Sequence, residues 1–98
     1  MILYEKTYER PGNESWLVDM IQIHRNDLGL YVEHKIRWKS SWAEPITENH
    51  TIDLDENDLD ESQKILDEYL DNNSLRITYP NKEKDGFHIN LKKIINDN

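Results

Sequence analysis

Hydrophobic and polar residues alternate through much of the first half of the chain, a pattern typical of β-strands. In the clearest run, Leu30 to Trp38, every second position except His34 is apolar, as expected of a strand with one buried and one solvent-facing side. Aromatic and β-branched residues fill Trp16 to Arg25, and turn-forming residues occupy Asn26 to Gly29, so these runs predict a hairpin. Ile2 to Tyr8 and Ile46 to Leu54 also have strand character. Four strands are therefore expected.

The apolar spacing then changes to the period of a helix. On a helical wheel one sector of about 40° holds Leu59, Leu66 and Leu70. This spacing predicts an amphipathic helix. The candidates for its N-terminal cap are Asp53, Asp55 and Asn57. The pair Asn72 and Asn73 is expected to end it.

Two further alternating runs follow the predicted helix. They cover Leu75 to Tyr79 and Phe87 to Leu91, with a polar turn between them, and they predict a second hairpin. The order of elements predicts an α+β fold, in which an antiparallel β-sheet of about five to six strands carries one amphipathic acidic α-helix on one face. We expect a single domain over residues 1–98, frayed at 96–98, with Trp16 and Trp38 in its core.

The charge of the chain is concentrated in one segment. The 98 residues contain 20 acids and 12 bases, a net charge of −8. The stretch from Asp53 to Asp71 has nine acids and one base, which is −8 by itself, so the remaining residues are neutral overall. A charge spread evenly over the surface would indicate only solubility, whereas a concentrated one indicates a partner of opposite charge.

Composition excludes several classes of function. The chain has no cysteine, which excludes disulfide scaffolds and thiol catalysis and fits a reducing compartment. It has no apolar run of about eighteen residues and no basic leader, so we expect a cytoplasmic protein of a bacterial host cell without membrane contact. Neither a nucleophile elbow nor a phosphate-binding loop is present. We therefore predict no enzymatic activity and no cofactor, and we leave a homodimer open.

Histidines are the candidates for a metal site, and they are His24, His34, His50 and His88. None has a helical or strand partner at the spacing of a metal motif. His34 and His50 fall on the apolar sides of two predicted strands, where a buried histidine with a backbone hydrogen bond is the commoner outcome. We predict no metal, and a small metal-binding module using His and Asp residues is an alternative reading.

Aromatic and basic residues alternate near the end of the clearest strand. Tyr31, Trp38 and Trp42 lie close in sequence to three bases, which is a pattern of platforms for single-stranded nucleic acid. The net charge of −8 would repel phosphate, so we expect no direct binding of nucleic acid. Trp42, in a loop before Pro45, is instead expected to be an exposed interface residue.

The side of the helix opposite its leucines carries an outward stripe of acids that resembles the charge of nucleic acid. The predicted partner-binding residues are Asp60, Glu61, Asp67, Glu68, Asp71 and Trp42. In size, acidity and lack of cysteine the chain is similar to phage-encoded inhibitors of host defence nucleases, anti-CRISPR proteins among them, and to immunity proteins that neutralise nuclease toxins.

This general resemblance, together with the charge, leads to the hypothesis of a small inhibitor. It would occupy a basic nucleic-acid-binding groove of a nuclease or other nucleic-acid enzyme, such as a CRISPR effector nuclease. An immunity protein for a bacterial nuclease toxin is the second reading. A passive structural subunit, kept soluble by its acidic helix, is a third.

Overall fold

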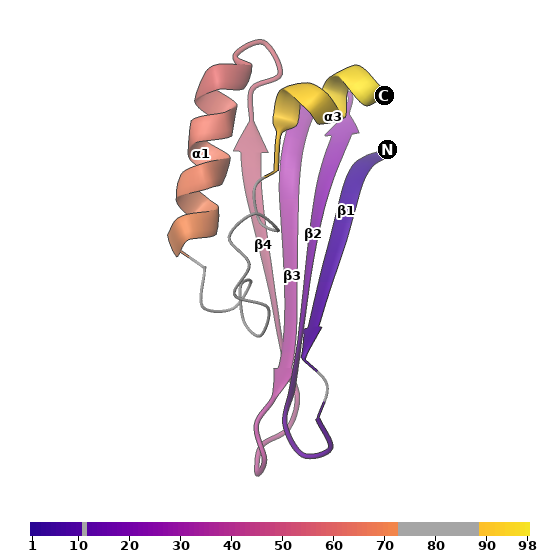
Figure 1. Cartoon of the computed structure of the whole chain (residues 1–98), viewed down its shortest axis with the longest axis vertical. Helices are drawn as coiled ribbons and strands as arrows, with labels where there is room; N and C mark the ends of the chain where they lie inside the picture. The colour runs from indigo at the N-terminus through magenta and orange to yellow at the C-terminus, as the bar shows by residue number, and fades with distance from the viewer. Residues whose placement is uncertain (11, 73–88) are drawn as a thin grey trace.

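The protein has an α+β fold with one antiparallel sheet and two helices (Figure 1). The computed structural model describes residues 1–10, 12–72 and 89–98. The elements in these ranges are β1 Ile2–Arg10, β2 Trp16–Asn26, β3 Gly29–Lys39, β4 Ile46–Leu54, α1 Leu59–Asn72 and α3 Leu91–Asp97. The strands follow one another across the sheet in the order β1-β2-β3-β4, so each pairs with its neighbour in sequence.

The hairpin between β2 and β3 is confirmed, and the side chain of Asn26 closes its turn. Asn26 Oδ1 accepts hydrogen bonds from the backbone N–H groups of Leu28, at 2.9 Å, and Gly29, at 3.1 Å. Gly29 has φ +133°, a conformation that glycine adopts without the steric cost of a Cβ. The turn chemistry read from Asn26 to Gly29 therefore sets the register of the two longest strands.

The sheet has four strands in the described residues, so the expectation of five to six strands is wrong. Residues 75–79, one half of the expected second hairpin, lie outside the described residues. The other half was expected to be a strand from Phe87 to Leu91. This prediction is wrong at Leu91, which is the first residue of helix α3. The fold thus has a second helix where the sequence pattern predicted a strand.

Capping explains why the chain becomes helical at this point. Asn90 Oδ1 accepts a hydrogen bond from the backbone N–H of Lys93 at 3.1 Å, the arrangement of an N-cap. Leu91, Ile94 and Ile95 recur at helical spacing, and Leu91 is fully buried. An apolar alternation of three residues is too short to separate a strand from the start of a helix.

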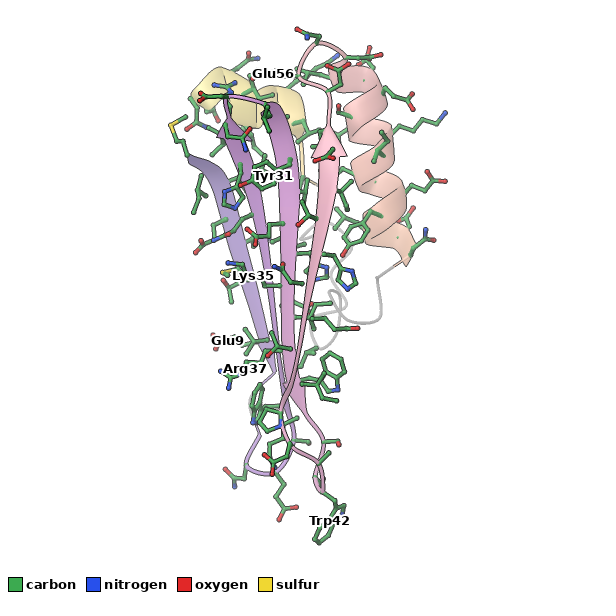
Figure 2. The ribbon with its side chains drawn as sticks, turned by 180° about the vertical axis from the view of Figure 1, so that it is seen from behind. Glu9, Tyr31, Lys35, Arg37, Trp42 and Glu56 are labelled. Carbon is green, nitrogen blue, oxygen red and sulfur yellow. The ribbon has the colours of Figure 1, made fainter. Side chains whose placement is uncertain are left out.

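Both helices pack on the same face of the sheet. Ile21 and Ile23 of β2 and Val32 of β3 share a buried cluster with Leu66 of α1 and Leu91 of α3, and each of the five side chains is at most 1% exposed. Burial of one such side chain stabilises the fold by about 1.5–3 kcal/mol. The opposite face of the sheet carries no described helix, and it is called the open face below (Figure 2).

The molecule is elongated, with extents of 46 × 28 × 22 Å. The helices lie near one end of the strands, and the loop between β3 and β4 lies at the other end (Figure 1). Of the tryptophans expected in the core, Trp16 and Trp38 are both half-buried and outside the main buried cluster. The Arg37 guanidinium carbon lies 5.5 Å from the centroid of a Trp16 ring, so Trp16 contributes to the open face instead.

No helix within the described ranges is long and apolar enough to cross a membrane.

Candidate acidic interface on helix α1

Helix α1 begins at Leu59, directly after the residue that caps it. Asp58 Oδ1 accepts a hydrogen bond from the backbone N–H of Glu61 at 3.1 Å, and this contact satisfies one free N–H of the first turn. The cap predicted from the sequence was Asp53, Asp55 or Asn57, and the observed cap is none of these. Asp55 instead accepts from the backbone N–H of Asn57 at 2.9 Å, inside the loop that follows β4.

One side of α1 is fixed against the rest of the protein. Its buried residues are Ser62, Leu66 and Leu70, four positions apart and therefore on one face. Ser62 Oγ exchanges two hydrogen bonds of 2.8 Å with the backbone of Asp55. Gln63 reaches the segment before α3, since its Nε2 donates to Ile89 O at 2.7 Å and its Oε1 accepts from the Leu91 N–H at 2.9 Å. The orientation of α1 is thus determined.

The acids of α1 lie on the side opposite these contacts. We call them the acidic ridge, and they are Asp60, Glu61, Asp67, Glu68 and Asp71. At 100° per residue they fall within an arc of about 120°. Four of them are exposed, while Asp67 is half-buried and accepts a hydrogen bond from Gln63 Nε2 at 2.9 Å. The acids therefore share one outer surface.

Two lysines lie at this surface. Lys64 lies in the middle of the arc of the ridge and is exposed. Lys92 of α3 contacts Asp60, with 2.7 Å between Nζ and Oδ1. The hydrogen bond and the charge of Lys92 lower the pKa of Asp60 below its ordinary value of 3.8, and the same contact raises the pKa of Lys92. Because both side chains are exposed, water screens this pair.

Trp42 is not brought to the acidic ridge. Its side chain is 98% exposed, and it lies at the tip of the β3–β4 loop, at the end of the molecule away from α1 (Figure 2). The aromatic residues of β3 are also separated. Tyr31 and Trp38 differ by an odd number of positions, so they point to opposite faces of the sheet. The three aromatic residues considered as a stacking platform therefore do not form one surface.

A buried polar cluster between the sheet and α1 is the main feature that sequence reasoning missed. His34 Nε2 lies 2.7 Å from Asp19 Oδ1, and both side chains are fully buried. His34 Nδ1 lies 2.5 Å from the Tyr69 hydroxyl of α1. His50 Nε2 and Asp19 Oδ2 are buried without a hydrogen-bond partner among the described residues. His34 is thus buried as expected, but its partners are side chains of two other elements.

One signal in the sequence could have revealed this cluster. Asp19 occupies an inward position of β2, two residues before the buried Ile21. A carboxylate on an apolar face needs a hydrogen-bond partner inside the protein. His34 is an inward polar residue of the neighbouring strand, and it pairs in register with Ile21. The two polar residues are therefore close neighbours on one face.

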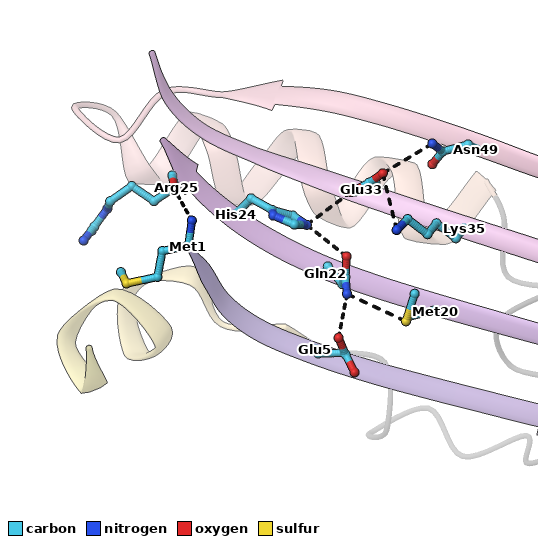
Figure 3. A network of polar contacts seen from close by, with 9 residues as sticks. All are labelled: Met1, Glu5, Met20, Gln22, His24, Arg25, Glu33, Lys35 and Asn49. Carbon is cyan, nitrogen blue, oxygen red and sulfur yellow. Dashed lines mark hydrogen bonds and ion pairs between the residues drawn. The ribbon is translucent and has the colours of Figure 1, made fainter. Parts of the chain in front are cut away.

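The open face carries a second polar network, which runs across all four strands (Figure 3). Gln22 Nε2 donates to Glu5 Oε2 at 2.6 Å. His24 Nε2 lies 3.0 Å from Gln22 Oε1 and 3.2 Å from Glu33 Oε2. Asn49 Nδ2 of β4 donates to Glu33 Oε1 at 3.3 Å. Because these side chains satisfy one another across strands, the network stabilises the sheet.

In residues 1–10, 12–72 and 89–98, no three side chains of His, Cys, Asp or Glu gather as ligands for a metal ion. Both ring nitrogens of His34 contact protein partners. His24 uses Nε2 within the open-face network. His88 lies outside the described residues.

Comparisons with protein-family models, curated proteins and solved structures find no match for this chain.

Proposed function

We propose that this protein is a small acidic inhibitor that occupies a basic nucleic-acid-binding groove of a nuclease or another nucleic-acid enzyme. The observation that supports this proposal is the acidic ridge, whose carboxylates share the outer side of α1 while Leu66 and Leu70 are buried. From Asp60 to Asp71 the ridge extends over about 17 Å at the rise of a helix. A groove whose Lys and Arg side chains bind phosphate is complementary to such a row of carboxylates.

The class of target follows from the same chemistry. We propose a phage counter-defence role of the anti-CRISPR type, in which the partner is a CRISPR effector nuclease of the bacterial host cell. The protein would act by binding, with no catalytic residue of its own. An immunity protein would present a similar surface to a nuclease toxin, and the identity of the captured enzyme distinguishes these two roles.

Affinity capture at two salt concentrations tests the proposal. The tagged protein is incubated with a bacterial lysate at about 50 mM and about 300 mM salt, because screening of exposed charges increases strongly over this range. We expect a basic nucleic-acid enzyme to be retained at the lower concentration and released at the higher one. Purified partner is then assayed for nucleic-acid binding with and without the protein.

A charge-reversed variant links the binding to the ridge. The exposed acids without contacts to α3 in the described residues are changed together, as Glu61→Lys, Glu68→Lys and Asp71→Lys. Asp60 and Asp67 are left in place because they contact Lys92 and Gln63. We expect the variant to lose capture.

The matched control makes the same change of net charge at exposed acids elsewhere, as Glu9→Lys, Asp27→Lys and Asp97→Lys. It is expected to keep binding at the lower salt concentration. Equal loss in both variants would show that only net charge matters, and retention by both would rule out the ridge as the contact.

A further inference from the structure

Trp42 is the largest apolar side chain that the protein leaves in solvent. It is 98% exposed at the tip of the β3–β4 hairpin, and Ile46 of the same hairpin is 45% exposed. A tryptophan buries roughly 150–250 Å² when it is enclosed, and tryptophans are over-represented among the residues that contribute most to protein interfaces. This end of the molecule therefore offers an apolar anchor.

The loop holds Trp42 in a defined position. The backbone N–H of Ala43 donates to Ser40 O at 3.2 Å, which closes a turn with Trp42 inside it. Strand pairing continues to Trp38 and Ile46 on either side of the loop. An anchor on a turn closed in this way loses less conformational entropy on binding than one on an open chain.

The surroundings of Trp42 indicate the charge of its partner. Glu44 of the same loop and Glu14 of the neighbouring β1–β2 loop are exposed. Lys39 is half-buried, and its Nζ donates to the backbone oxygen of Glu14 at 3.3 Å, which ties the two loops together. An anchor flanked by carboxylates is complementary to an apolar pocket with Lys or Arg at its rim.

We propose that this tip, comprising Trp42, Glu44 and Ile46 with Glu14 beside them, is a second binding surface. Trp42 inserts into an apolar pocket of a protein partner, and basic side chains at the rim of that pocket pair with the two glutamates. The surface lies at the opposite end of the molecule from α1 (Figure 2), so it acts independently of the acidic ridge. Carboxylates beside the indole disfavour an anionic lipid surface as the occupant.

Site-specific photocrosslinking tests the proposal. Trp42 is replaced by p-benzoylphenylalanine in the full chain, and the protein is irradiated in a bacterial lysate. Leu28 is the matched control position, because it is 97% exposed in the β2–β3 turn. We expect a discrete protein adduct from position 42 and none from position 28, with the attachment point in an apolar concavity bordered by Lys or Arg.

Competition gives the quantitative readout. Unlabelled wild-type protein is expected to suppress the adduct, Leu28→Ala to compete within about twofold, and Trp42→Ala to need roughly tenfold more protein, as for an interface hot spot. Full competition by Trp42→Ala, no adduct from position 42, or the same adduct from both positions would overturn the proposal. A Trp42-dependent blue shift of fluorescence with zwitterionic phosphatidylcholine vesicles, without a protein adduct, would assign the tip to lipid and also overturn it.

The ridge variant Glu61→Lys, Glu68→Lys, Asp71→Lys separates this proposal from the function proposed above. If that variant competes fully while Trp42→Ala does not, the tip is supported independently of the ridge, and the affinity capture alone decides the ridge. If Trp42→Ala competes fully while the ridge variant does not, the ridge is supported and the tip fails.

Discussion

His34 connects three elements through its two ring nitrogens. A carboxylate accepts hydrogen bonds, so Nε2 donates to Asp19 Oδ1, and Nδ1 makes the second contact with the Tyr69 hydroxyl. A buried polar group that loses its partner costs more free energy than the net gain of one hydrogen bond. The cluster is therefore expected to contribute to the position of α1 on the sheet.

The Tyr69 hydroxyl gives a direct test of this contact. Tyr69→Phe keeps the aromatic ring but leaves His34 Nδ1 without its partner, and we expect the free energy of unfolding to fall by about 1–3 kcal/mol. Tyr31→Phe is the matched control, because Tyr31 stacks on His24 through its ring, with centroids 4.8 Å apart. The control is expected to change stability by no more than about 0.5 kcal/mol. Urea denaturation measures both, and equal effects would contradict the assigned role.

The pair of Asp60 and Lys92 makes a prediction about titration. Lys92 lowers the pKa of Asp60, so the contribution of the pair is present above the ordinary value of 3.8 and is lost as pH falls through the lower folded value. The raised pKa of Lys92 sets the upper limit, since the contribution is lost as pH rises above 10.5 through the folded value. We expect an NMR titration of the Asp60 carboxyl to show a midpoint below 3.8.

Lys92→Gln removes the charge that causes this shift, so the Asp60 midpoint is expected to return towards 3.8. Lys93→Gln changes the neighbouring exposed lysine of α3 and serves as the control. A midpoint that moves equally in both variants would show that general charge, rather than the direct contact, determines the shift.

At the scale of elements, the ends of α1 and α3 depend on single polar side chains. Asp58 caps α1 and Asn90 caps α3, whereas the sequence offered several acids and amides near the start of α1. The aspartates before Asp58 do not reach the first turn of α1, because Asp53 belongs to β4, which continues through Leu54, and Asp55 lies in the loop that follows. A local pattern thus located α1 without identifying its cap.

Asp58→Ala tests the cap. It removes the acceptor for the Glu61 N–H, and we expect a loss of about 1 kcal/mol in the free energy of unfolding. Asp53→Ala is the control, because Asp53 is exposed in β4 and caps no helix. Thermal and urea unfolding followed by circular dichroism compare the two. A larger loss for Asp53→Ala would contradict the assignment of the cap.

At the scale of the whole molecule, the two proposed surfaces lie at opposite ends of an elongated protein. Changes at sites that share no neighbours usually add in free energy within about 0.3–0.5 kcal/mol. For a partner that engages both surfaces, we expect the binding free energies lost by Trp42→Ala and by the triple ridge reversal to add when both are combined. Isothermal titration calorimetry with the purified partner measures this, and a strongly non-additive result would show that the surfaces are coupled.

The described strands and α1 were largely predictable, because adjacent residues encode their periodicity. The alternation of Leu30 to Trp38 appears as β3, and the leucine spacing after Leu54 appears as α1. The start of α3 was not predictable in the same way, since Phe87 to Leu91 is compatible with either period. The candidate site could be predicted only as individual residues, the acids of α1 and Trp42. Whether these side chains lie on one surface could not be predicted from the sequence.

By itself the sequence determined the strand and helix periods, the turn at Asn26 to Gly29 and the location of the excess negative charge, because each depends on residues that are neighbours in the chain. Only the tertiary structure joined Asp19 and His34 to Tyr69, which follows His34 by 35 positions. It also paired Asp60 with Lys92 and placed Trp42 at the end of the molecule away from α1. These relations arise when distant segments pack together, and no local pattern specifies which residues then meet.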